Sequence, residues 1–172
     1  MAAAADRPSF GLKRRAAPTI RWLFAFVAVT PFGAIAAALV SQYAYGMQPC
    51  PWCVLERLIF VALGVFALLG LVWRGTAGSR VAATCASVLA LAGFTAAMWQ
   101  HFVAARSESC AQTLADRIMT ASQLDQLVPS VFEARVSCAD AAVNILGIPY
   151  PFLAAMLFAL CAIAMVRALR LA

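Results

Sequence analysis

Four long apolar runs constrain this chain more than any other feature of its sequence. A helix needs about 20 residues to cross the hydrocarbon layer of a bilayer. The apolar runs reach about that length, at Trp22–Val40, Val54–Trp73, Val81–Trp99 and Ile148–Val166. Hydrophobic residues make up 65% of the chain and charged residues only 12%, which excludes an ordinary soluble domain. The sequence therefore predicts an all-α integral membrane protein, built as a four-transmembrane-helix bundle.

The basic residues lie mostly on one side of this predicted bundle. Of the 13 basic residues, all but four fall before the first span, between spans two and three, or after the fourth span. The positive-inside rule then places both termini in the cytoplasm and the two loops 41–53 and 100–147 outside it. The net charge of +6 is explained by these anchoring charges, so we expect no nucleic-acid partner. The predicted organisation is a cytoplasmic tail, a transmembrane domain and a second short tail, at residues 1–21, 22–166 and 167–172.

A dithiol motif lies where the first outer loop meets the second span. Cys50 and Cys53 are separated by two residues, a spacing that can close a small, readily reduced disulfide. Cys53 lies at a helix start, where unpaired backbone N–H groups favour a thiolate. Arg57 follows on the same helical face and can hold a developing anion near the sulfur. The alternative is that Arg57 only snorkels to the headgroups with Glu56 as its partner, but the neighbouring dithiol favours a functional role.

The second outer loop carries two further cysteines, Cys110 and Cys138. Disulfides persist outside the cytoplasm, so the two outer pairs can be redox centres that exchange with each other. One alternative is a pair of inert disulfides that brace the loops, and another is a zinc site of four cysteines. The oxidising side of the membrane disfavours zinc, and we expect no metal. Cys85 and Cys161 lie inside predicted spans, where we expect them to be small packing residues.

His101 begins the second outer loop, close to the level of Arg57 in the predicted bundle. It is the single histidine of the chain. This position makes His101 a candidate cofactor-binding residue, with a plain interfacial polar residue as the alternative.

The same loop contains a predicted interfacial helix. Ser122 and Asp125 have the spacing of a capping box, and apolar residues follow at helical intervals up to Phe132. Such a short amphipathic segment is expected to lie against the membrane surface. Pro129 interrupts the pattern, so we expect the helix to bend or break at Val128.

Three segments together resemble the disulfide bond formation protein B (DsbB) family. The first is Cys50-Pro-Trp-Cys53-Val-Leu-Glu-Arg57 at the start of the second span. The second is Trp99-Gln-His101 at the end of the third span, and the third is Leu124–Phe132, which leads to Cys138. The resemblance covers roughly residues 22–166. Each segment alone is a weak signal, but the C-x-x-C-x-x-x-R block with two cysteines in the next outer loop is a strong one.

The resemblance implies a protein-disulfide:quinone oxidoreductase of the bacterial inner membrane with its cysteine loops in the periplasm. Such an enzyme reoxidises a periplasmic thioredoxin-like oxidase (DsbA-type) and passes the electrons to ubiquinone or menaquinone. An oxidase of that type has a potential near −120 mV, which requires a stronger final oxidant than a nicotinamide.

The resemblance also implies a role for each candidate residue. Cys110 would form the mixed disulfide with the partner, and Cys138 would complete that pair and exchange with Cys50 through a disulfide between the two loops. Cys53 would be the thiolate that faces the quinone. Arg57 would stabilise negative charge on the quinone, with His101 as a weaker candidate beside it.

Overall fold

The computed structural model describes residues 10–73, 75–106, 113–145 and 147–171, with side chains from residue 18 onward. Four long helices dominate these residues, and all four are long and apolar enough to cross a membrane. They are α1 (Phe10–Tyr45), α2 (Pro51–Val72), α3 (Thr76–Phe102) and α7 (Tyr150–Leu171). The predicted fold class, an all-α membrane protein with four spanning helices, is therefore confirmed.

The helix ends differ from the predicted span ends where helix propensity or a short strand pair overrides hydropathy. Helix α1 begins at Phe10 rather than Trp22, because a segment rich in alanine, lysine and arginine continues the helix beyond the apolar run. Helix α7 begins at Tyr150 rather than Ile148. The intervening residues form a two-residue strand, β2 (Ile148–Pro149), which pairs with β1 (Asn144–Ile145). Gly147 lies between the strands with a φ of 84°, a conformation that glycine adopts without strain.

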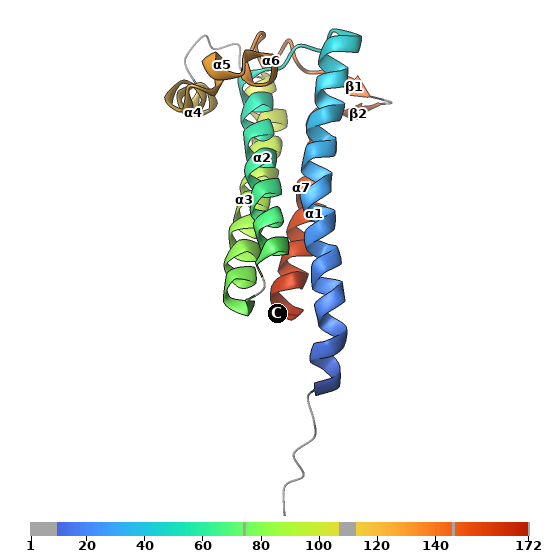
Figure 1. Ribbon diagram of the computed structural model, residues 1–172. Helices are drawn as coiled ribbons and strands as arrows, with labels where there is room; N and C mark the ends of the chain where they lie inside the picture. The colour runs from blue at the N-terminus through green and yellow to red at the C-terminus, as the bar shows by residue number, and fades with distance from the viewer. Residues whose placement is uncertain (1–9, 74, 107–112, 146, 172) are drawn as a thin grey trace, which may run out of the picture.

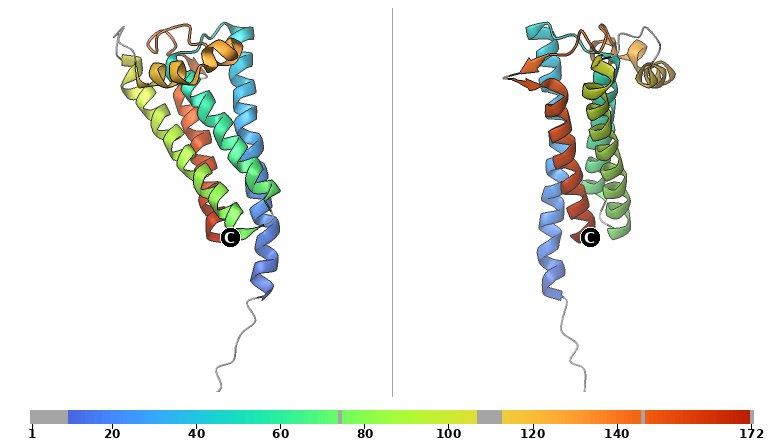
Figure 2. Two further views of the ribbon diagram at one scale, coloured as in Figure 1. Left: turned by 60° about the vertical axis from the view of Figure 1, so that its left-hand side comes forward. Right: turned by 180° about the vertical axis from the view of Figure 1, so that it is seen from behind.

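The four long helices form one bundle, with α3 packed against both α2 and α7 and α1 packed against the same two helices. Helices α2 and α3 are antiparallel neighbours (Figure 1). The N-terminal part of α1 extends past the ends of the other helices (Figures 1 and 2). The start of α1 and the end of α7 lie at one end of the bundle, and the short helices lie at the other.

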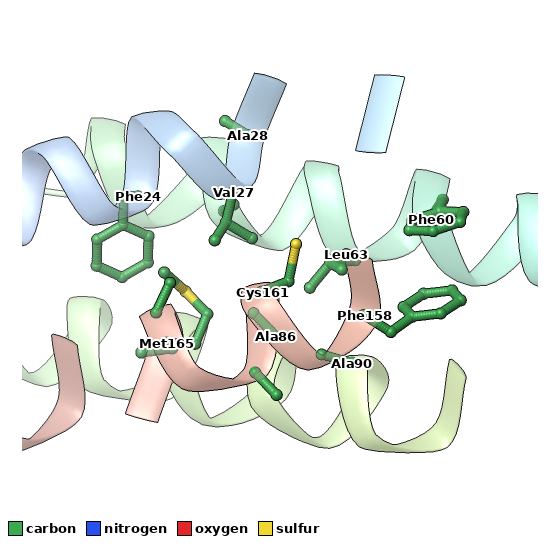
Figure 3. Packing of buried hydrophobic residues seen from close by; sticks show 14 of the residues in the cluster. Phe24, Val27, Ala28, Phe60, Leu63, Ala86, Ala90, Phe158, Cys161 and Met165 are labelled. Carbon is green, nitrogen blue, oxygen red and sulfur yellow. The ribbon is translucent and has the colours of Figure 1, made fainter. Parts of the chain in front are cut away.

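The bundle interior is filled by small residues and a few rings. Phe60 of α2 stacks on Phe158 of α7 with ring centroids 3.9 Å apart (Figure 3). Gly93 lets the Phe158 ring lie directly against α3, since a Cβ at this position would overlap the ring. Cys161 projects from α7 into this core and is fully buried, in keeping with its predicted packing role. Cys85 is half-buried on α3.

The long segment between α3 and α7, which contains the predicted second outer loop, folds into short helices across one end of the bundle (Figure 2). They are the 3₁₀ turn η1 (Ala104–Arg106) and helices α4 (Leu114–Ser122), α5 (Leu124–Leu127) and α6 (Pro129–Phe132). The predicted break at Val128 is confirmed, because this residue separates α5 from α6.

The predicted capping box of this loop is wrong. The Ser122 hydroxyl donates to the Met119 carbonyl and caps no helix, although α5 does begin at Leu124, with Gln123 as its N-cap. The observed capping box uses Thr113 and Asp116 at the start of α4. Asp116 supplies the carboxylate that closes the box on the Thr113 backbone, an arrangement that satisfies two backbone donors of the first turn.

Candidate functional site

The dithiol motif forms the start of helix α2. Cys50 is the N-cap residue and Pro51 is the first helical residue, a position where a missing N–H costs no hydrogen bond. The Cys53 backbone N–H donates to the Cys50 sulfur at 3.3 Å, so this thiol takes the place of the usual hydroxyl or carboxylate cap. The Cys50 and Cys53 sulfurs lie 2.8 Å apart as free thiols. Local helix geometry therefore holds the two sulfurs in contact.

Cys138 from the second outer loop joins this pair. Its thiol forms a hydrogen bond with Cys50, and both side chains are buried in one apolar cluster at the end of the bundle. The Arg135 backbone N–H donates to the Pro49 carbonyl at 2.9 Å, which ties the two cysteine loops together. The structure thus brings three of the four predicted redox cysteines together. The fourth, Cys110, lies outside the described residues.

The contact between Cys50 and Cys138 shifts the pKa values of the two thiols in opposite directions. It raises the pKa of the Cys50 thiol well above its usual range, and the Cys53 contact and burial act in the same direction. The same contact lowers the pKa of Cys138, an effect that burial opposes. Of the two thiols, Cys138 is therefore the one that loses its proton more readily. Cys50 is the central sulfur, with a potential nucleophile on either side.

Gln100 contacts both sulfurs of the dithiol and was missed from the sequence. Its side-chain nitrogen lies 3.2 Å from the Cys53 sulfur and 3.6 Å from the Cys50 sulfur. The residue is only 4% exposed. A sequence signal was available, since Gln100 continues the helical face of small residues formed by Ala86, Ala90, Gly93 and Ala97.

Arg57 is buried and joins three parts of the chain. One guanidinium nitrogen donates to the Gln42 side-chain oxygen of α1 at 2.9 Å and to the Val131 carbonyl of α6 at 2.8 Å. Only 6% of the residue is exposed, which does not fit simple snorkelling to the headgroups. Within the described part of the chain, no ion pair joins Arg57 to Glu56.

A cavity of about 270 Å³ lies beside the dithiol, between α1, α2 and α7. Cys53 and Arg57 both line it. Most of the wall is apolar and comes from side chains such as Ile35, Phe60, Leu153 and Leu157. Apolar walls with a few convergent polar groups are typical of small-molecule sites. The cavity could therefore hold a small apolar ring in contact with Cys53.

Two polar atoms of the cavity wall have no hydrogen-bond partner within the described residues. They are side-chain oxygens of Gln48 and Glu56, and both are buried. Buried polar atoms are nearly always paired, so unpaired ones in a cavity wall are available to a bound molecule.

His101 lies outside the set of described residues that line the cavity. Its ring packs against Phe102 and Phe152, with ring centroids 4.9 and 4.5 Å away. The structure therefore brings Cys53 and Arg57 together at the cavity but places His101 among aromatic rings.

Comparison with known proteins gives consistent matches along most of the chain. The model of the family described as "Disulfide bond formation protein DsbB" matches residues 20–168. A protein of Chromobacterium violaceum named disulfide bond formation protein B is 32% identical over 146 residues, which cover 82% of this chain and 87% of the relative. A protein of the same name from Ralstonia nicotianae is 31% identical over 139 residues, or 76% of this chain and 82% of the relative.

Proposed function

Because the chain belongs to the disulfide bond formation protein B family, we propose that it oxidises a DsbA-type thioredoxin-like dithiol and delivers the electrons to a membrane quinone. The family and the four spanning helices identify it as a membrane protein of disulfide bond formation. The proposal adds the electron donor, the electron acceptor and the residues that connect them.

The position of Cys53 is the observation that carries this proposal. Its sulfur lies 2.8 Å from that of Cys50, and its side chain also lines the apolar cavity. One sulfur therefore belongs both to the exchanging thiols and to a site that can take an apolar acceptor. A loop-bracing disulfide would have no need of such a cavity.

The cysteines act in sequence. The partner thiolate attacks the Cys110 sulfur of a Cys110–Cys138 disulfide, forms the mixed disulfide with Cys110 and releases Cys138 as a thiolate. The Cys138 thiolate attacks the Cys50 sulfur, which it contacts, so the Cys50–Cys138 bond forms, the Cys50–Cys53 bond breaks and Cys53 leaves as a thiolate. Cys53 is the last thiolate and faces the acceptor. Thiol–disulfide exchange of this kind needs only a thiolate in contact with the attacked sulfur.

The residues around the cavity fit a quinone headgroup. Apolar side chains of three helices suit the ring, and the buried Arg57 can stabilise negative charge on a ring oxygen. The unpaired oxygens of Gln48 and Glu56 can accept hydrogen bonds from its reduced form. A quinone supplies a two-electron acceptor that is soluble in the membrane. We assign contact with the ring to Arg57 and Cys53, and none to His101.

The same proposal sets the topology. The chain lies in the bacterial inner membrane with both cysteine loops in the periplasm and both termini in the cytoplasm. The uneven distribution of the 13 basic residues supports this orientation. The apolar cavity then lies where a quinone can reach it from the bilayer.

Titration of the outer thiols in isolated membranes tests the function. We expect added ubiquinone or menaquinone to consume thiols in the wild-type protein and to leave the Cys53→Ser variant reduced. If added quinone leaves the number of titratable thiols in the wild-type protein unchanged, the result would support bracing disulfides instead. Thiols that become accessible only after a chelator is added would support zinc binding.

A further inference from the structure

A single buried amide lies beside the branching point of the thiol pathway. The Cys50 sulfur contacts both Cys53 and Cys138, so it can form a disulfide with either. The Gln100 side-chain nitrogen donates to the Cys53 sulfur at 3.2 Å and to the Cys50 sulfur at 3.6 Å. Within the described residues, no hydrogen bond joins Gln100 to Cys138.

Each disulfide leaves a different sulfur as the free thiolate. When Cys50 is bonded to Cys138, the free sulfur is Cys53, which has the Gln100 amide as a donor. When Cys50 is bonded to Cys53, the free sulfur is Cys138, which has the Trp52 backbone N–H as a donor. Hydrogen bonds to an ionised sulfur are stronger than those to a neutral one. The two donors therefore favour opposite products.

The burial of Gln100 indicates that its contacts with the sulfurs matter. The side chain is 4% exposed, and its amide oxygen has no partner within the described residues. An unpaired buried oxygen is costly, and the other buried residues of α3 are alanines, a glycine and Ser87, whose hydroxyl donates to the Ala83 carbonyl. Contact with the two sulfurs is the compensation that the structure offers for that cost.

We propose that Gln100 is a positioning residue that biases Cys50 toward the disulfide with Cys138 by holding Cys53 as the free thiolate. The inference rests on the proposed function, in which Cys50 exchanges between these two partners. In the exchange, the Cys53 thiolate attacks the Cys50 sulfur of the Cys50–Cys138 disulfide. A new S–S bond forms, the old one breaks, and the electron pair leaves on Cys138. The reactants and the products each contain one disulfide and one thiolate, so the exchange needs no external oxidant.

The preference of Cys50 for the disulfide with Cys138 affects when the acceptor can react. A Cys53 thiolate that is stabilised beside the cavity is ready for an acceptor before the dithiol closes. Without the Gln100 amide, the Cys50–Cys53 disulfide would close before an acceptor has bound, and no thiolate would remain in contact with the cavity. Gln100 thus delays closure until the acceptor site can be used.

The equilibrium between the two disulfides tests this inference. We would use full-length Cys110→Ser protein in quinone-free detergent, so that the outer cysteines form one disulfide and leave one thiol. After equilibration in a glutathione buffer, acid quenching and alkylation, mass spectrometry gives the ratio of Cys50–Cys138 to Cys50–Cys53. We expect Gln100→Met to lower this ratio about ten- to a hundredfold, as loss of a hydrogen bond to a charged group implies. Thr95→Val, five residues earlier on α3, should leave it unchanged.

Alkylation kinetics separate this role from a packing role. In fully reduced protein, loss of the Gln100 amide donor should slow the reaction of Cys53 with iodoacetamide about tenfold or more. The rate at which iodoacetamide modifies Cys138 should not change. A packing defect predicts the opposite sign, because a looser site would expose Cys53 and speed its reaction. If Gln100→Met does not accumulate in membranes, Gln100→Leu takes its place.

An unchanged disulfide ratio in a folded Gln100 variant, or faster alkylation of Cys53, would overturn the inference. Neither measurement contains quinone or a partner protein. A negative result in these two measurements would leave the proposed quinone reaction untouched. A negative result in the quinone titration would not change the measured effect of Gln100 on the ratio of the two disulfides.

Discussion

Replacement of Arg57 tests the acceptor site most sharply, because this buried side chain has both a structural and an electrostatic task. Its guanidinium donates to the Gln42 side chain at 2.9 Å and to the Val131 carbonyl at 2.8 Å. Arg57→Ala leaves two acceptors unpaired at a cost of about 1–3 kcal/mol each, so we expect a loss of about 2–6 kcal/mol in stability. Arg57→Lys keeps the charge and can keep one of the two bonds.

The effect on quinone use should exceed the effect of reduced stability. Removal of a preorganised group that stabilises developing negative charge lowers rates about 10²–10³-fold. We therefore expect quinone kcat/KM to fall about a hundredfold or more in Arg57→Ala and about tenfold in Arg57→Lys. The assay is steady-state quinone reduction in proteoliposomes at matched amounts of folded protein, with thermal unfolding recorded for each variant.

Arg135→Ala is the matched control. Arg135 is also an arginine of the cysteine-bearing side, but its side chain is 40% exposed and pairs with Glu133 at 2.9 Å. Exposed ion pairs contribute about 0–1 kcal/mol, so quinone kcat/KM should stay near the wild-type value. Wild-type kcat/KM in Arg57→Ala would refute the assignment of Arg57 to the acceptor site.

Two further predictions follow from contacts of the described residues. At neutral pH, iodoacetamide should modify Cys138 well before Cys50, because their contact lowers the pKa of Cys138 and raises that of Cys50. Raising the pH should narrow the difference as Cys50 begins to ionise, and equal rates at neutral pH would contradict the opposite pKa shifts of the two thiols. Gly93→Ala should destabilise the bundle by about 1–3 kcal/mol, because the added Cβ overlaps the Phe158 ring. Thermal unfolding measures this loss, and an unchanged Tm would show that the ring can move at no cost.

The apolar runs predicted the four spanning helices because hydropathy over about 20 residues is the main requirement of a span. Helix ends were less predictable. The start of α1 at Phe10 depends on helix propensity outside the apolar run, and the start of α7 at Tyr150 depends on a small strand pair. Both are local effects that a hydropathy pattern does not contain.

The candidate site was predictable where its residues are close in sequence. Cys50, Cys53 and Arg57 lie within two helical turns, so their spacing alone places them together. The contact of Cys138 with Cys50 spans two loops and depends on tertiary structure, which sequence spacing does not fix. Gln100 was missed because an uncharged amide carries no strong chemical signal, although it continues a buried helical face.

The central claim is that electrons leave the thiols through Cys53. Its most direct test is an anaerobic single turnover, in which fully reduced protein is mixed with excess quinone and both quinol and disulfides are counted. We expect a Cys50–Cys53 disulfide to appear with the first quinol in the wild-type protein, and neither product in Cys53→Ser. Wild-type quinol formation by Cys53→Ser would contradict the account.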